Sequence, residues 1–241
     1  MPPLKIVLRT DRGNLPIGAV PRVVGVLSSL DWPLPPSRPE GSCDLVEVRL
    51  DQTGRPEGWL ERCREIQNCG WPVLLTIRLK SEGGAWGDGD VKRLPLFAEA
   101  IKVVAGVDIE WRSRIVHRVA MLCIRRRHVC VISYHDFKKT PPPAELAAII
   151  TEAQKIASIV KIATKLNSPG DEEILRWLLA QKWERPLCLI GMGPQWSHTR
   201  ISLPKLGSCL AYGYLDKPTA PGQLSAEELT AQLRGELRSD A

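Results

Sequence analysis

Eight short apolar segments, separated by stretches that suit helices, constrain the fold of this chain more than any other feature. Each is rich in Val, Ile and Leu, as expected of strands that are buried on both faces of a parallel sheet. With the intervening helical patterns, they repeat at about thirty residues per unit. The segments are Pro21–Leu27, Cys43–Asp51, Trp71–Arg78, Val107–Trp111, His128–Tyr134, Ser158–Ala163, Pro186–Gly191 and Leu206–Leu215.

This alternation predicts an α/β fold, a (β/α)8 TIM barrel, in a single domain over residues 1–241. Two further strand patterns, at 4–9 and 14–18, flank a turn-forming tetrad at 11–14 and predict an N-terminal β-hairpin within residues 1–20. A doubly wound open sheet is the alternative. It is less favoured, since no strand is followed by a complete GxGxxG motif; the segment 191–193 (GMG) has Trp196 in place of the third glycine.

Composition excludes several classes of protein. The net charge is +6, but the densest basic cluster, Arg125–Arg127, contains no aromatic residue and suits the end of a helix, so we expect no nucleic-acid partner. Seven cysteines, none in a CxxC motif, are typical of a reducing compartment. The sequence has no apolar run of 18 residues and no leader pattern. We therefore expect a cytoplasmic protein with no membrane partner.

Lys161 is the residue that most suggests chemistry. It lies in the middle of the apolar segment Ser158–Ala163, where a buried ammonium is costly unless it is paired or loses its proton. Burial lowers a lysine pKa, and a neutral amine is a nucleophile towards carbonyl groups. The alternative is that Lys161 lies at a strand end and reaches water along its stem.

Strand alternation directs several other charged side chains to the same side as Lys161. If these faces all point into the barrel, most of the charges lie towards the C-terminal ends of the strands, where barrel enzymes carry their chemistry. A structural ion-pair network would explain the charges alone, but a histidine beside a lysine on adjacent strands suits imine chemistry. The inward set is Glu47, Arg49, Arg78, Asp108, Glu110, His135 and Lys161.

Six motifs, in order along residues 15–237, resemble those of the type I 3-dehydroquinate dehydratases. They are 44–51 (DLVEVRLD), 76–84 (TIRLKSEGG), 133–137 (SYHDF), 160–163 (VKIA), 191–193 (GMG) and 220–223 (APGQ). The resemblance implies a lyase that converts 3-dehydroquinate to 3-dehydroshikimate in the shikimate pathway of aromatic amino acid biosynthesis. It also implies a homodimer and no metal or organic cofactor.

The resemblance also implies roles for individual residues. Lys161 corresponds to the Schiff-base lysine, His135 to the general acid and base, and Glu82 to the glutamate that assists the histidine. Arg200 corresponds to the arginine that clamps the substrate carboxylate. The remaining substrate-binding positions are Glu47, Arg49, Arg78, Thr219 and Gln223.

This sequence departs from the family pattern at two places. Thr219 stands where the family usually has serine, which keeps a hydroxyl, and the segment 163–166 reads ATKL where the family tends to be apolar. The loop 216–223, with two prolines and a glycine, is predicted to be a lid that excludes water; a plain connecting loop is the alternative.

Two other functions fit parts of the sequence. A class I aldolase also places a lysine on the sixth strand of this barrel, but the pairing of His135 with Glu82 and the Arg200 clamp argue against it. A non-catalytic barrel would be expected to lack Lys161, His135 or Arg200, and all three are present. His198 lies near Arg200 in the sequence and is expected to be a bystander.

Overall fold

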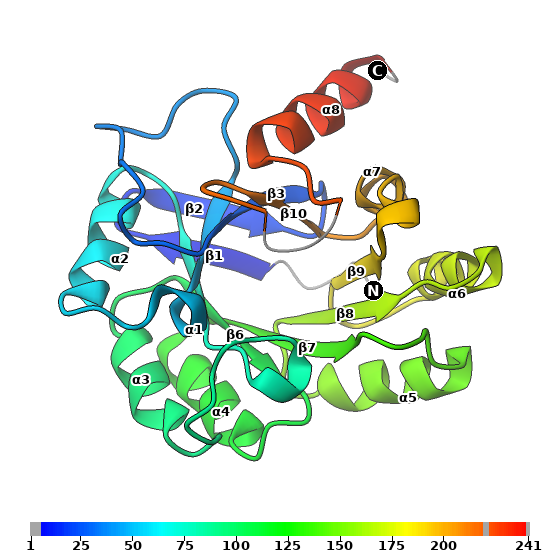
Figure 1. Ribbon diagram of the computed structural model, residues 1–241, viewed down its shortest axis with the longest axis horizontal. Helices are drawn as coiled ribbons and strands as arrows, with labels where there is room; N and C mark the ends of the chain where they lie inside the picture. Colours follow the sequence, from blue (N-terminus) through cyan, green and yellow to red (C-terminus); the bar gives the residue numbers. More distant parts are fainter. Residues whose placement is uncertain (1–5, 219–221, 240–241) are drawn as a thin grey trace.

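The structure of the protein, a computed structural model, describes residues 6–218 and 222–239. A barrel of eight parallel strands forms its centre, and an antiparallel hairpin, β1–β2, precedes the barrel (Figure 1). The strands are β1 (Ile6–Thr10), β2 (Gly13–Ile17), β3 (Arg22–Leu27), β4 (Leu45–Arg49), β5 (Val73–Thr76), β6 (Gly106–Glu110), β7 (Val129–Asp136), β8 (Ile159–Lys165), β9 (Leu187–Met192) and β10 (Leu210–Tyr214).

At least one helix follows each barrel strand except β3, and the helices cover the outside of the barrel (Figure 1). The segment 28–44, between β3 and β4, contains no helix. The helices are α1 (Leu50–Thr53), α2 (Trp59–Asn68), α3 (Arg93–Ala100), α4 (Val116–Arg126), α5 (Pro143–Ala153), α6 (Pro169–Ala180), α7 (Thr199–Lys205) and α8 (Ala226–Ser239), with the 3-10 turns η1 (Lys80–Glu82) and η2 (Pro194–Trp196). Capping residues start some of them. Ser225 and Glu228 form the capping box that begins α8, where the Glu228 N–H donates to Ser225 Oγ at 3.1 Å.

The spatial order of the strands, β10-β3-β4-β5-β6-β7-β8-β9, confirms the predicted barrel and leaves one seam, between β9 and β10. A side chain bridges this seam. The buried Ser208 hydroxyl accepts the Leu189 N–H at 2.8 Å, and the Cys209 N–H donates to the Leu187 carbonyl at 2.8 Å. The barrel is therefore nearly closed, with a short bridge where a full ladder would lie.

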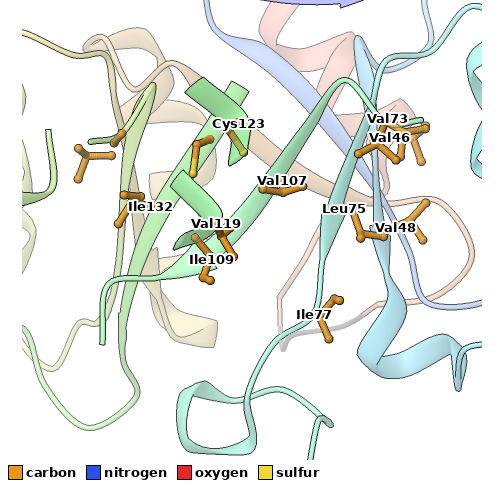
Figure 2. Close-up of a cluster of buried hydrophobic side chains, with 14 of the residues drawn as sticks. Val46, Val48, Val73, Leu75, Ile77, Val107, Ile109, Val119, Cys123 and Ile132 are labelled. Atoms are coloured by element: carbon orange, nitrogen blue, oxygen red, sulfur yellow. The ribbon is translucent and has the colours of Figure 1, made fainter. Parts of the chain in front are cut away.

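Alternation along the strands produces two separate apolar layers. Outward side chains such as Val48, Leu75 and Ile109 pack against the helices, including Val119 and Cys123 of α4 (Figure 2). The inward layer contains the first inward residue of most strands together with three residues of the hairpin, so β1–β2 packs against the N-terminal end of the barrel. Its members include Ile6, Leu8, Ile17, Leu45, Leu74, Val129, Ile159 and Leu210.

Above this inward apolar layer the interior becomes polar, as the alternation predicted. Glu47, Asp108, Glu110 and Lys161 are each at most 5 % exposed, although charged residues are rarely buried to this degree. Apolar side chains fill the N-terminal half of the barrel, and buried charges occupy the C-terminal half. The fold thus places the charged residues at the C-terminal end of the barrel.

Asp90 lies at the starts of two helices, α3 and α4. Its carboxylate accepts hydrogen bonds from the Arg93 guanidinium at 2.6 Å, from the Ser113 hydroxyl and from the Arg114 N–H. The segment 112–115 is therefore a turn outside α4, which begins at Val116. All seven cysteines are free, and all except Cys69 are buried.

Candidate active site

Lys161 lies near the middle of β8 and its side chain crosses the barrel interior. Its Nζ atom donates to Asp108 Oδ2 at 3.0 Å and lies 4.0 Å from Glu47 Oε1. The Tyr212 ring covers the amine from another side, with its centroid 4.1 Å from Nζ. Strands β4, β6, β8 and β10 therefore converge on one buried amine.

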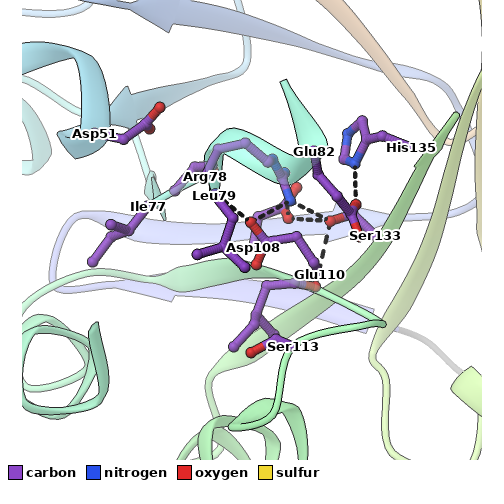
Figure 3. Close-up of polar contacts among 12 residues, drawn as sticks. Asp51, Ile77, Arg78, Leu79, Glu82, Asp108, Glu110, Ser113, Ser133 and His135 are labelled. Atoms are coloured by element: carbon purple, nitrogen blue, oxygen red, sulfur yellow. Dashed lines mark hydrogen bonds and ion pairs between the residues drawn. The ribbon is translucent and has the colours of Figure 1, made fainter. Parts of the chain in front are cut away.

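Asp108 is held rigidly by two groups besides the lysine. Its Oδ1 atom accepts hydrogen bonds from Arg78 Nη2 at 2.7 Å and from Ser133 Oγ at 2.6 Å (Figure 3). Burial alone would raise the pKa of this carboxyl, but the positive charges of Arg78 and Lys161 outweigh burial and hold the pKa well below its usual range. Asp108 is therefore a fixed anion in the barrel.

Arg78 connects this anion to the neighbouring carboxylate of Glu110. Arg78 Nη1 donates to Ser133 Oγ at 2.8 Å and lies 3.4 Å from Glu110 Oε1. Burial by itself would lower the pKa of the guanidinium, yet Asp108 and Glu110 raise it above its ordinary value. Arg78 thus stays charged at the centre of the network.

Glu110 also forms an ion pair with Arg93, which is fully buried. Arg93 Nη1 donates to Glu110 Oε2 at 2.7 Å, and the Leu79 N–H donates to Glu110 Oε1 at 2.8 Å. Buried ion pairs cost desolvation energy, and they persist where further hydrogen bonds satisfy the charged atoms. These contacts fix the backbone just before η1, the turn that carries Glu82.

His135, at the end of β7, forms a pair with Glu82. Its Nδ1 atom lies 3.0 Å from Glu82 Oε2, and the two side chains are 10 % and 3 % exposed (Figure 3). Burial, Arg78 and Lys161 lower the pKa of His135 well below its usual 6.5, while burial raises the pKa of Glu82 to about 7. Around pH 6 the pair is therefore uncharged, with a protonated Glu82 beside a neutral imidazole.

The two glycines that follow Glu82 make this geometry possible. Gly83 has φ = 76°, and a Cβ there would lie 2.3 Å from Phe137 Cζ, whose ring stacks on the His135 imidazole. At Gly84 a Cβ would lie 2.1 Å from the Arg78 carbonyl oxygen. Residues without a side chain are required here, because the loop folds back on the segments directly after β5 and β7.

Glu47 and Arg49, both on β4, occupy different surroundings. Glu47 Oε1 accepts a hydrogen bond from Thr76 Oγ1 at 2.6 Å and faces Lys161. Arg49 forms a bidentate ion pair with Asp51, at 3.0 and 2.8 Å. Its charge still acts on His135, where it lowers the imidazole pKa. The structure thus places Glu47 near the lysine and pairs Arg49 with Asp51 of α1, the short helix directly after β4.

Arg200, on α7, lies at the seam between β9 and β10. It lines a small cavity together with Tyr212, the residue whose ring covers Lys161, and its Nε atom donates to the Gly222 carbonyl at 3.1 Å. Burial lowers the pKa of Arg200 from its ordinary value. Arg200, the predicted clamp arginine, therefore contacts the end of the predicted lid at Gly222, which precedes Gln223 in the sequence. Thr219 lies outside the described residues.

Two groups in this site were given no role from the sequence. Asp108 was among the inward residues, but the pattern does not distinguish it from Glu47 or Glu110. Tyr212 was part of an apolar strand, and its hydroxyl is buried without a hydrogen-bond partner among the described residues. His198 is half-exposed, and its Nε2 atom lies 2.9 Å from Glu172 Oε2.

No group of three or more His, Cys, Asp or Glu side chains in 6–218 and 222–239 is arranged to hold a metal ion. None of the helices in that part of the chain is long and apolar enough to cross a bilayer.

A nearly closed parallel barrel, with a buried lysine and a histidine–glutamate pair at the C-terminal ends of its strands, defines a TIM-barrel enzyme. The family model described as type I 3-dehydroquinase matches residues 37–238. The chain belongs to the type I 3-dehydroquinase family, which confirms the resemblance seen in the sequence motifs.

Curated relatives and solved structures agree with this assignment. The chain is 36 % identical over 225 residues to a 3-dehydroquinate dehydratase of Methanosarcina acetivorans, covering 86 % of this chain and 91 % of the relative. It is 35 % identical over 193 residues to one of Methanocella arvoryzae, covering 79 % and 86 %.

Among solved structures, a 3-dehydroquinate dehydratase from Aquifex aeolicus has a TM-score of 0.74 at 28 % identity, covering 89 % of this chain and 98 % of that one. A type I enzyme from Clostridium difficile has a TM-score of 0.83 at 22 % identity, covering 98 % and 99 %, which supports the fold alone.

Proposed function

We propose that this protein dehydrates 3-dehydroquinate to 3-dehydroshikimate through a Schiff base on Lys161. Membership of the type I 3-dehydroquinase family supports the substrate. The observation that carries the chemistry is the buried Nζ atom of Lys161, which lies in the barrel with the His135–Glu82 pair on the neighbouring loop and strand. An amine held in this way can capture a ketone.

In the first stage, the neutral amine of Lys161 adds to the ketone carbon. A C–N bond forms as the C–O double bond opens, the oxygen takes up a proton, and loss of water leaves a cationic iminium. The iminium withdraws electrons and makes the adjacent C–H bond acidic. The water lost here returns in the last stage, when hydrolysis of the imine releases product and restores the lysine.

In the second stage, His135 removes the proton from the carbon next to the iminium. The low pKa of the imidazole keeps it neutral at physiological pH and therefore able to accept a proton. Glu82 engages Nδ1, so Nε2 is the nitrogen that takes the substrate proton. The resulting enamine expels the neighbouring hydroxyl, which leaves as water with the proton that His135 received, and gives the conjugated product.

The charged residues around the lysine orient the substrate. Glu47 lies 4.0 Å from Nζ, and Arg78 pairs with Asp108, the carboxylate that also contacts the lysine. Both side chains suit the substrate hydroxyls, and Arg49 does the same from the end of β4. The planar guanidinium of Arg200 suits a bidentate contact with the substrate carboxylate. Thr219 and Gln223, on the loop after β10, are proposed to close over the bound substrate.

An ultraviolet assay tests this function. The protein is mixed with 3-dehydroquinate, and the absorbance of the conjugated enone product is followed. We expect turnover in the wild type and none in Lys161→Ala. Lys165→Ala is the matched control, because Lys165 lies on the same strand but is exposed, and it should retain turnover. A Lys161→Ala protein that forms the enone at the wild-type rate would refute the proposal.

We further propose that the chain acts as a homodimer of single-domain barrels in the cytoplasm. The family resemblance supports the dimer, and seven free cysteines support a reducing compartment. Sedimentation of the full chain tests the dimer: a mass of twice 26.8 kDa is expected, and a monomer at micromolar concentration would contradict it.

A further inference from the structure

The structure assigns Asp108 a function in the reaction: we propose that it is the counter-ion that positions the Lys161 nitrogen and stabilises the iminium cation. This inference rests on the proposed function of Lys161 and goes beyond it, because neither the sequence motifs nor the proposed function assigns a role to Asp108.

The Asp108 carboxylate is held in a fixed position beside the Lys161 nitrogen. Asp108 Oδ2 is 3.0 Å from Nζ, and its second oxygen is held by Arg78 at 2.7 Å and by Ser133 at 2.6 Å. The carboxylate therefore cannot rotate away from the lysine without breaking two hydrogen bonds. A ligand fixed by other residues in this way holds its partner in one place and orients it.

The buried charges inside the barrel balance one another. Three buried cations, Arg78, Arg93 and Lys161, lie among three buried anions, Glu47, Asp108 and Glu110. Glu110 is engaged by the two arginines, and Glu47 lies 4.0 Å from Nζ and accepts the Thr76 hydroxyl. Asp108 is therefore the carboxylate within hydrogen-bond distance of Nζ among the residues that the structure describes. Its loss would leave one cation unbalanced.

Asp108 is suited to act as a counter-ion and not as a base. The pKa of Asp108 is held well below its usual range, so the carboxylate is a weak base and remains an anion throughout the neutral range. An anion that keeps its charge can interact with the ammonium, and then with the iminium, at the same atom. The proton that the lysine loses must go elsewhere, and the neutral imidazole of His135 is able to accept it.

Several other ionisable groups surround the amine and enter any pH measurement. They come from every strand that packs against Lys161, and the low pKa of His135 and the high pKa values of the Cys188 thiol and the Tyr212 phenol keep these three groups neutral near pH 7. The groups are Glu47 on β4, Arg78 just after β5, Asp108 and Glu110 on β6, His135 on β7, Cys188 on β9 and Tyr212 on β10.

The test is to trap the iminium with cyanoborohydride and 3-dehydroquinate over a range of pH. In Asp108→Asn the side chain keeps its shape but loses its charge, so the ammonium is less favoured. We expect the pH of half-maximal trapping to fall by about one to three units, and kcat to fall on the order of 10²-fold because a preorganised charge is missing. A purely structural role would leave the pH of half-maximal trapping unchanged.

Glu110→Gln is the matched control. Glu110 is the next inward carboxylate on the same strand and is equally buried, but its partners are Arg78 and Arg93 rather than the lysine. We expect this variant to lose stability while its trapping midpoint stays at the wild-type pH. A midpoint that moves equally in both variants would overturn a specific role for Asp108.

If Asp108→Asn does not fold, a second variant, Asp108→Glu, tests the same inference. Asp108→Glu keeps the charge but displaces the carboxylate by one methylene, so we expect kcat to fall at least about tenfold; a wild-type kcat would overturn the inference. The wild-type protein separates the two proposals. If it forms no adduct, the proposed function fails; if it forms one and Asp108→Asn behaves like the wild type, only the role of Asp108 fails.

Discussion

Replacing Glu82 by glutamine should make the folded protein more stable at alkaline pH than the wild type. Glu82 is 3 % exposed, and one of its carboxylate oxygens, Oε1, has no hydrogen-bond partner among the described residues. The neutral amide resembles the protonated acid in shape. The substitution therefore removes a buried charge while it retains an oxygen that can accept a hydrogen bond from His135.

The magnitude follows from the pKa of Glu82, which burial raises from 4.5 to about 7. Between these two pH values the folded protein holds a proton that the unfolded chain has lost, so stability falls as the pH rises through this window. At 1.36 kcal/mol per pKa unit, the loss reaches about 3 kcal/mol above pH 7. Below pH 4.5 both states are protonated and this loss vanishes. Glutamine does not titrate and should escape it.

The assay is urea unfolding of both proteins at pH 4.5 and pH 8, with the free energy of unfolding compared at each pH. We expect Glu82→Gln to gain about 3 kcal/mol over the wild type at pH 8, relative to the difference at pH 4.5. Glu173→Gln is the control, because Glu173 is exposed on α6 and should show no such dependence. If the two proteins differ in free energy of unfolding by the same amount at both pH values, burial does not raise the pKa of Glu82 as described.

Three further predictions concern single positions. Gly84→Ala should destabilise the protein by about 1–3 kcal/mol and lower turnover, because its Cβ would lie 2.1 Å from the Arg78 carbonyl oxygen. The same change at Gly235, within α8 and with open space around it, should stabilise by about 0.5–1 kcal/mol; thermal melts of the two variants should shift in opposite directions. Tyr212→Phe removes a buried hydroxyl without a described partner, so its melting temperature should equal or exceed that of the wild type, and a clear decrease would show that the hydroxyl is satisfied.

The fold was predictable because its signal is repeated. Each barrel strand is apolar on its outer face, so patterns such as Val46 and Val48 beside Glu47 and Arg49 indicate both a strand and the direction of its charged side. The lysine at 161 was recognisable for the same reason, since it interrupts an otherwise apolar strand. The bounds of single elements were less predictable: the segment Leu206–Leu215 was expected to be a strand, whereas β10 spans Leu210–Tyr214.

The partners of the lysine were not predictable from the sequence. Glu47, Asp108 and Glu110 all lie on inward faces, and the stagger of the barrel decides which carboxylate reaches Nζ. In the structure Thr76 pairs in register with Asp108, and Ser133 with both Glu110 and Lys161. The Ser133 hydroxyl nevertheless donates to Asp108 Oδ1 at 2.6 Å rather than to its register partner Glu110. Alternation within one strand contains no information about register between strands. The role of Thr219 stays a prediction.

The most direct test of the account is to reduce the wild-type protein with borohydride in the presence of 3-dehydroquinate and to map the adduct by peptide mass spectrometry. The account predicts a covalent adduct on Lys161, at the buried amine 3.0 Å from Asp108, and no adduct in Lys161→Ala. An adduct on an exposed lysine such as Lys165, or dehydration of the substrate with no adduct at all, would contradict it.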